Sequence, residues 1–327
     1  MSRPVRLHAI YVALDDAALF RASIASIYGE VDGITVVTTH DRDWRGSARD
    51  PSAITAMVLS RDVDPDRKVD LIITSETSEA RSRGRAMDFA APRRRTLDVD
   101  PEHRSDAPHR SPDYFLIVDA DEIYEAGAIT RLKEHVARGR HRYYRVPCVR
   151  YFKRWNYRID GHEWALSVVR ADRRVPYLRR RRTVSVVRRG LARVPGLPSG
   201  AVARLLGYWD VPPEVACFHH GSYVGPRERI AAKLASFGHA DEVPDAWMTQ
   251  VYDRWTTDAV DFNPAYPTAF PSAREVPVDE LPPEIRGFAW PDGYLLEDDT
   301  TSSGRAGAAS EIGGSGKASP AIPGHGR

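Results

Sequence analysis

Cysteine is scarce in this chain: Cys148 and Cys217 are the only two among 327 residues. A small secreted domain held together by disulfides needs several pairs, so that class of protein is excluded, and the thiols fit a reducing compartment such as the cytoplasm. Apolar runs are short, and none approaches the roughly 20 residues that a membrane-spanning helix needs. The sequence therefore predicts neither a disulfide scaffold nor an integral membrane protein.

A recognisable export signal is also missing. The apolar run from Leu7 to Ala13 is followed by Asp15 and Asp16, where a signal-peptide cleavage site would need small residues. We therefore expect this run to form a first strand of the folded protein.

Charge is balanced overall but unevenly distributed. The formal net charge is +2, yet the segment from Arg173 to Arg204 contains ten arginines and no acidic residue. Such a segment fits a peripheral contact with an anionic membrane, a polyanion or a lipid-diphosphate acceptor, or else a solvated face of β-hairpins. Because it lacks the interleaved aromatic residues of a nucleic-acid module, we do not expect nucleic acid as a partner. The tail 299–327 is rich in Gly, Ser and Ala and is predicted to be disordered.

Strand and helix patterns alternate along the first half of the chain. β-Branched or apolar runs predict strands at 7–13, 33–39, 69–74 and 114–118. Apolar residues at helical spacing predict helices around Phe20–Tyr28, after Asp50-Pro51, over Ser78–Ala90 and around Ile129–Val136. This alternation predicts an α/β fold with a mostly parallel sheet that is flanked by helices.

After Arg140 the pattern changes to strand-like pieces at 142–152, 164–170 and 183–189, which predict a smaller β-rich lobe on the same sheet. We expect residues 1–150 and 151–298 to be two halves of one domain, with the second half holding an acceptor. In a parallel sheet of this kind, ligands bind beyond the carboxyl ends of the strands.

An acidic pair follows the fourth predicted strand directly. The chain contains five Asp-x-Asp triplets, at 41/43, 62/64, 64/66, 98/100 and 119/121, but only Asp119 and Asp121 come immediately after a buried apolar run. The triplets at 62–66 and 98–100 are predicted to be solvated turns. Two carboxylates about 4 Å apart repel by about 4 kcal/mol at an effective dielectric near 20, so a divalent cation such as Mg²⁺ or Mn²⁺ is the simplest way to keep both ionised. The alternative is that one of them caps a helix beginning near Glu125.

The stretch Asp113-Tyr-Phe-Leu-Ile-Val-Asp-Ala-Asp-Glu-Ile123, preceded by Arg81-Ser-Arg-Gly-Arg-Ala-Met-Asp88, resembles the GT-A glycosyltransferases, especially the family-2-like group. The resemblance covers about residues 5–150. It implies a Rossmann-like GT-A fold and a nucleotide-diphospho-sugar donor in the first half, with Asp119 and Asp121 at the metal and diphosphate. It also implies that Asp41 reads the nucleobase or ribose and that Arg83 faces the nucleotide. The alternatives are a turn acid for Asp41 and an exposed side chain for Arg83.

A second resemblance lies later in the chain. The segment Cys217-Phe-His-His-Gly-Ser-Tyr223, followed by a helix with Ile230, Lys233, Leu234 and His239, is similar to the C-terminal part of bisecting-type N-acetylglucosaminyltransferases. This implies that a histidine completes the metal shell and that Lys233 binds phosphate. We favour His219, because the strand-like run before it places it nearest the strand end, with His220 as the alternative. Otherwise one histidine is buried with a backbone partner and the other is solvated.

The segment Arg154–Trp164 offers candidates for a catalytic base and an acceptor site. A base must take a proton from the acceptor hydroxyl, and Asp160, His162 and Glu163 are available. We favour Glu163, although the acidic pair that family-2-like enzymes often use has no clear copy here. In the alternative, Trp155 and Trp164 are core residues and the acids lie on a polar face.

Together these features predict a cytoplasmic, metal-dependent glycosyltransferase that transfers a hexosyl or N-acetylhexosaminyl group to a glycan, a lipid-linked acceptor or a small molecule with a hydroxyl group. One alternative is a nucleotidyltransferase of sugar phosphates, for which the first loop, Ala13 to Asp16, lacks a glycine- and arginine-rich phosphate site. The other is a basic, non-catalytic protein that binds polyanions or membrane surfaces.

Overall fold

The computed structural model describes residues 4–14, 16–43, 46–76, 78–91, 112–161, 163–171, 207–236 and 240–295. All of these residues belong to one compact unit. The arginine-rich segment, the predicted strand at 183–189, the Asp-x-Asp triplet at 98/100, His162, His239 and the tail from residue 299 lie outside the described residues.

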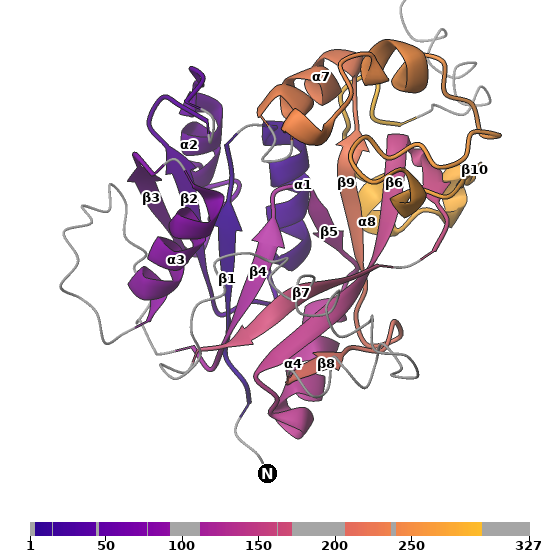
Figure 1. Cartoon of the computed structure of the whole chain (residues 1–327). Helices are drawn as coiled ribbons and strands as arrows, with labels where there is room; N and C mark the ends of the chain where they lie inside the picture. Colours follow the sequence, from indigo (N-terminus) through magenta and orange to yellow (C-terminus); the bar gives the residue numbers. More distant parts are fainter. Residues whose placement is uncertain are drawn as a thin grey trace, which may run out of the picture. The chain divides into compact units, whose positions relative to one another are not determined.

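A mixed β-sheet forms the centre of this unit (Figure 1). Its four N-terminal strands are parallel and stand in the order β3-β2-β1-β4; they are β1 (Leu7–Val12), β2 (Gly33–Thr39), β3 (Val69–Thr74) and β4 (Tyr114–Asp119). The order continues with β7 (Glu163–Arg170), β6 (Tyr143–Ile159), β9 (Phe218–Val224) and β5 (Glu122–Tyr124). The short strands β8 (Tyr208–Asp210) and β10 (Ala273–Glu275) pair with β6.

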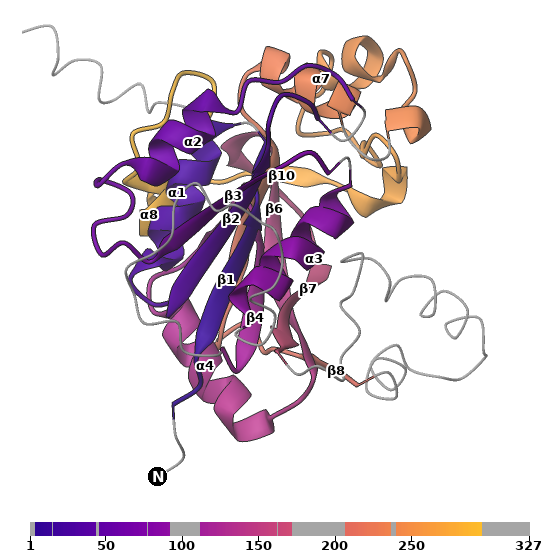
Figure 2. The same cartoon turned by 90° about the vertical axis from the view of Figure 1, so that its left-hand side faces the viewer.

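Helices cover both faces of the sheet. Figure 2 shows α1 (Ala17–Tyr28) and α2 (Ser52–Leu59) on one side of it and α3 (Glu79–Ala90) on the other. The other α-helices of the described residues are α4 (Ala128–Gly139), α7 (Arg227–Ser236) and α8 (Pro283–Arg286). Single turns of 3₁₀-helix lie at Ala240–Glu242, Pro267–Ala269 and Val278–Glu280, and a π-helical turn lies at Met248–Tyr252. The α/β prediction is thereby confirmed.

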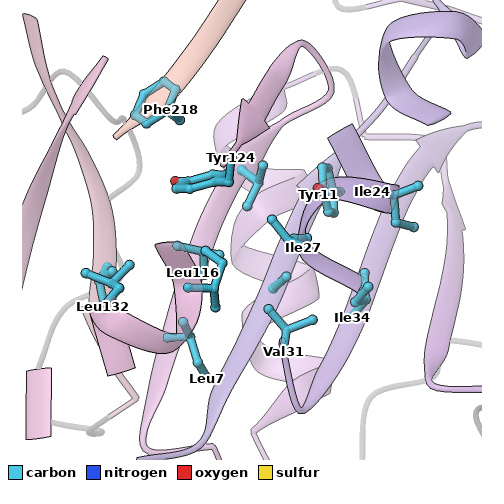
Figure 3. Packing of buried hydrophobic residues seen from close by; sticks show 14 of the residues in the cluster. Leu7, Tyr11, Ile24, Ile27, Val31, Ile34, Leu116, Tyr124, Leu132 and Phe218 are labelled. Carbon is cyan, nitrogen blue, oxygen red and sulfur yellow. The ribbon is translucent and has the colours of Figure 1, made fainter. Parts of the chain in front are cut away.

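The core consists of layers on the two faces of the parallel strands. Along β1, Tyr11 packs in the layer that contains α1, α2 and α4, whereas Ile10 packs in the layer that contains α3. Figure 3 shows Tyr11 and Leu116 of the sheet beside Ile27 of α1. All seven residues of β2 are buried, as expected for a parallel strand that is covered on both sides.

The bounds of β2 and β3 coincide with the predicted ranges, and α2 follows Asp50-Pro51 as predicted. The carboxylate of Asp50 accepts a hydrogen bond from the Ser52 amide, but Pro51 occupies the cap position, just before the helix. Leu59 is exposed, because Ile54 and Val58, which are four residues apart, already face the sheet, and the next position points away from it.

The loop between α2 and β3 corrects one prediction. Asp64, which was predicted to lie in a solvated turn, is only 4% exposed. Its carboxylate accepts hydrogen bonds from the hydroxyl of Tyr28 at 2.7 Å and from the backbone amide of Lys68 at 2.8 Å. This carboxylate is therefore buried and connects the loop to α1, instead of facing solvent.

The two halves predicted for the domain share one strand. β6 is 17 residues long and crosses residue 150, so the boundary predicted there falls inside a strand. The sheet also curls strongly, because only Ala120 and Asp121 separate β4 from β5, although three strands lie between them in the sheet order. This curl brings β9 and its partner β5 close to the carboxyl end of β4.

Gly221 of β9 allows this close approach. A Cβ atom at this position would lie 2.7 Å from the ring of Trp155 and 3.3 Å from Leu19 of α1. The amide of Gly221 donates a hydrogen bond of 2.8 Å to the carbonyl oxygen of Asp121. A glycine is therefore needed where β6, β9, α1 and the β4–β5 link meet.

We predict that Gly221→Ala lowers the free energy of unfolding by about 1–3 kcal/mol, because the added methyl group overpacks the contact with the buried ring of Trp155. Urea denaturation measures the change. Gly84→Ala is the matched control: no atom lies within 4 Å of its added Cβ inside α3, so it should stabilise the protein by up to about 1 kcal/mol. Equal stabilities for Gly221→Ala and wild type would contradict the packing described here.

Candidate functional site at the carboxyl end of β4

The acidic pair lies where β4 ends. Asp119 is the last residue of β4, and Asp121 lies in the two-residue link to β5. Neither caps a helix, because β5 follows directly and α4 begins at Ala128, behind Gly127 and without a side-chain cap. The helix-cap alternative for these aspartates is therefore wrong.

Asp121 is buried, at 7% exposed, and its carboxylate has two basic partners. One oxygen lies 2.5 Å from the Nζ of Lys233, on α7, and the other lies 3.3 Å from the Nε2 of His220, on β9. Residues that are about a hundred positions apart in the sequence thus meet at one carboxylate.

These contacts set the charge states of the pair. Burial by itself raises the pKa of Asp121, but Lys233 and His220 lower it, and the pKa ends far below the ordinary value. For His220 the balance is reversed: burial lowers its pKa, but the carboxylate of Asp121 raises it above the ordinary value of 6.5. Asp121 is therefore an anion at neutral pH, and His220 takes up a proton more readily than an isolated histidine does.

Asp119 pairs with a different cation. Its carboxylate lies 2.5 Å from an Nη atom of Arg83, and Arg83 also forms an ion pair with Glu79, one turn earlier on α3. Arg83 is only 6% exposed, whereas its neighbours Arg81 and Arg85 point outward and pair with Glu76. The structure thus identifies Arg83 as the arginine of this helix that reaches the acidic pair, and the exposed alternative for it is wrong.

The two adjacent histidines point to opposite faces of β9, as successive residues of a strand do. His219 hydrogen-bonds to the hydroxyl of Tyr151 at 2.9 Å through Nδ1 and to Glu125 at 3.1 Å through Nε2. The expectation that His219 is the histidine beside the acidic pair is therefore wrong, and His220 takes that place. The cause is the strand register, in which His220 pairs with Glu122, the residue after Asp121.

Two predicted residues are not brought to this cluster. Asp41 is exposed and forms an ion pair with its neighbour Arg42, at 3.9 Å. In the same loop Asp43 is buried and accepts a hydrogen bond of 2.9 Å from the Ser47 amide. Asp160 accepts a hydrogen bond of 2.6 Å from the hydroxyl of Ser272, which precedes β10, so it joins two chain segments beyond the end of β6.

Glu163 begins β7 and has a side chain that is 64% exposed. Because β7 runs antiparallel to β4, its first residues lie toward the same edge of the sheet as the end of β4. The Nη1 of Arg150 lies 3.4 Å from its carboxylate. Trp155 is fully buried, as the core alternative expected, whereas Trp164 is 36% exposed.

Sequence reasoning missed a second ion pair that holds α7 at this edge. Arg229, four residues before Lys233, pairs with Asp16 in the loop after β1 and donates to the carbonyl oxygen of Val224 at 2.6 Å. Asp16 also accepts a hydrogen bond of 3.1 Å from the hydroxyl of Tyr294. The spacing of four between Arg229 and Lys233, which places both on one face of a helix, was the available signal.

The donor atoms fit a divalent cation that arrives with a substrate. Mg²⁺ and similar ions prefer carboxylate oxygens and are usually held by one or two carboxylates together with substrate phosphates. Asp119 and Asp121 provide such carboxylates. In the part of the chain that the structure describes, no group of three or more His, Cys, Asp and Glu side chains is arranged to hold a metal ion. A metal cage made entirely of protein ligands therefore does not fit the described residues.

A pocket of about 390 Å³ lies away from this cluster, beside the first residue of β4. Its lining includes Asp113, Tyr114, Arg140 and Arg170. It contains none of the residues that the sequence predicted for the site. Its size alone does not make it the functional centre, because the buried charges gather at the other end of β4.

No protein-family model matches this chain, and no curated protein matches its sequence significantly. Within the described ranges, no helix combines the length and the apolar character needed to cross a membrane. The assignment of a function therefore depends on the geometry of the chain's own residues.

We predict that Asp121→Asn lowers the pKa of His220 below 6.5, because the variant keeps the burial of the imidazole and removes the negative charge that offsets it. An NMR titration of the histidine ring signals measures this pKa. Asp253→Asn is the matched control, since it breaks an exposed ion pair between Asp253 and Arg227 at the start of α7. An unchanged pKa of His220 in Asp121→Asn would contradict the pairing.

The same variant should lower the free energy of unfolding by about 1.5–3 kcal/mol, which is the contribution of a hydrogen-bonded charge. The raised pKa of His220 adds stability below pH 6.5, which is lost as the pH rises through the folded value. The lowered pKa of Asp121 adds stability above about pH 4, which is lost as the pH falls. The difference in unfolding free energy between wild type and Asp121→Asn should therefore be largest between these limits. Urea denaturation across this pH range measures it, and a difference that does not vary with pH would contradict the assignment.

Proposed function

We propose that this chain is a glycosyltransferase of the GT-A type, which moves a hexosyl or N-acetylhexosaminyl group from a nucleotide-diphospho-sugar to a hydroxyl group. The observation that supports it is the convergence of Asp119 and Asp121 with three basic side chains at the carboxyl end of β4. Those side chains are Arg83, His220 and Lys233, and they come from α3, β9 and α7.

The position in the sheet supports a nucleotide ligand. Ligands of open α/β sheets bind beyond the carboxyl ends of parallel strands, and β1 and β4 are neighbours there, with Val12 opposite Asp119. The loops after β1 and β2 lie at this same edge, because the strands are parallel. A nucleoside could occupy the ends of β1 and β2 while its diphosphate reaches the acidic pair, with Asp41 and Asp43 in the loop after β2.

The charges at this edge support a donor that arrives with a cation. Four carboxylates, on Glu79, Asp119, Asp121 and the buried Glu122, lie near three basic groups, on Arg83, His220 and Lys233. A diphosphate adds negative charge to a cluster that has no excess of positive charge, so its binding needs further positive charge. Asp119 and Asp121, together with phosphate oxygens of the donor, would hold Mn²⁺ or Mg²⁺, which would supply positive charge against the departing diphosphate.

The basic side chains have a role of their own in this proposal. With the carboxylates on a cation, Arg83 and Lys233 would donate hydrogen bonds to phosphate oxygens. The guanidinium of Arg83 offers a planar pair of donors, and the ammonium of Lys233 offers a compact charge. In the absence of donor, the ion pairs keep the carboxylates ionised and in place.

Glu163 is the proposed base. Its carboxylate is 64% exposed at the amino end of β7, where an acceptor hydroxyl can approach it from solvent. The carboxylate of Asp160 is less suited, because Ser272 already donates a hydrogen bond to it. Glu163 would take the proton as the hydroxyl oxygen attacks the sugar.

We predict that Asp119→Asn and Asp121→Asn each reduce turnover of the donor by about 100-fold or more, because each removes a carboxylate that would hold the cation against the departing diphosphate. Hydrolysis of UDP-, GDP- and dTDP-sugars with Mn²⁺, followed by release of the nucleoside diphosphate, measures this. Asp253→Asn, which breaks an ion pair with Arg227 on the same helix as Lys233, should keep wild-type turnover.

Binding measurements distinguish the alternatives. Calorimetry with UDP should give heat that depends on Mn²⁺ and disappears in Asp121→Asn. A basic binding protein without catalysis would bind polyanions with no such dependence, and a nucleotidyltransferase would release pyrophosphate from a nucleoside triphosphate and a sugar phosphate. Wild-type turnover in both aspartate variants would overturn the proposed function.

A further inference from the structure

Arg150 of β6 lies between the acidic pair and the proposed base. In the register of the sheet, Arg150 stands opposite His220 of β9, and Glu163 of β7 stands opposite Cys148, two residues earlier on β6. Residues paired across strands, and residues two apart along a strand, lie on the same face. Glu163, Arg150 and His220 therefore form a row across three neighbouring strands, and the row ends at Asp121.

The guanidinium of Arg150 is nearly buried, with a side chain that is 11% exposed. It lies 5.2 Å from the centre of the Phe270 ring, which supports its planar face. Its Nη1 reaches Glu163 at 3.4 Å, a long contact to a largely exposed carboxylate. Arg150 is thus held in place by packing rather than by a close ion pair.

The other edge of this guanidinium has no partner among the described residues. The Nε atom is buried and makes no hydrogen bond there. A buried donor of a charged group without a partner costs free energy, about 1–3 kcal/mol or more. The Nε atom and the adjacent Nη2 form the pair of parallel donors that binds a carboxylate or a phosphate in a bidentate manner. An oxyanion would therefore complete this arrangement.

We propose that Arg150 binds an oxyanion of a substrate at a point between the donor edge and Glu163. The assignment of that oxyanion rests on the proposed function: it is either a phosphate of the donor diphosphate or an acidic group of the acceptor, a carboxylate or a phosphate. In both cases Arg150 fixes one reactant beside the base. Arg150 is thus an additional binding residue, which none of the sequence motifs indicated.

The test uses titration calorimetry with pyrophosphate in the presence of Mg²⁺ and, separately, with glucuronate without metal. Wild type should bind at least one of these anions. Arg150→Gln should weaken that binding at least tenfold. Arg150→Lys keeps the charge but loses the bidentate edge, so its affinity for the anion should lie between those of wild type and Arg150→Gln. Arg227→Gln is the matched control, because Arg227 is an exposed guanidinium paired with Asp253, and it should bind as wild type does.

Stability provides a second readout. A purely structural arginine is needed for folding, whereas an arginine kept for binding is replaced by an apolar residue without loss. Arg150→Met should therefore leave the unfolding free energy unchanged or raise it. The proposal is overturned if Arg150→Met destabilises the protein by more than about 2 kcal/mol, or if neither anion binds in a manner that depends on Arg150.

Competition with UDP separates the two sources of the oxyanion. If Arg150 holds the donor diphosphate, saturating UDP abolishes the heat that depends on Arg150; if it holds an acceptor acid, this heat persists while UDP is bound. The two proposals also fail in different ways. If an anion binds in a manner that depends on Arg150 but no nucleotide sugar is turned over, the proposed glycosyltransferase function is overturned and the proposed oxyanion site still holds.

Discussion

The buried carboxylate of Asp121 is the constraint on which the candidate site depends. An ionised carboxylate inside a protein is tolerated only when basic partners compensate for the loss of water. Lys233 of α7 and His220 of β9 provide this compensation, and the main chain of Asp121 accepts a hydrogen bond from Gly221. Asp121 thereby holds together the end of β4, the start of β5, strand β9 and helix α7.

In the proposed function, the same ion pairs preorganise the site and are exchanged when the donor binds. Breaking a buried ion pair without replacing a partner is costly, so the partners stay together until another cation or anion takes their place. A diphosphate with its metal ion offers both charges at once, which is the exchange that the proposed function requires. The helix that carries Lys233 also carries Arg229, whose ion pair with Asp16 keeps it near the end of β1 during that exchange.

Much of this arrangement could be predicted from the sequence, because it depends on local patterns. The β-branched runs gave the bounds of β2 and β3, and the apolar run before Asp119 identified the acidic pair that the fold holds at a strand end. Which histidine of β9 faces Asp121 could not be predicted. Alternation along a strand places the two histidines on opposite faces, but the pairing with β5 decides which of them faces Asp121. The burial of Asp64 also depends on a distant partner, the hydroxyl of Tyr28, which a local turn pattern does not reveal.

The most direct test of the central claim is the position of Mn²⁺ in a crystal soaked with UDP and MnCl₂, located by anomalous scattering. We expect one ion at coordination distance from a carboxylate oxygen of Asp119 or Asp121, a diphosphate on the same ion, and Lys233 withdrawn from Asp121 toward a phosphate oxygen. An unaltered ion pair between Lys233 and Asp121, with the nucleotide bound elsewhere or not at all, would contradict it.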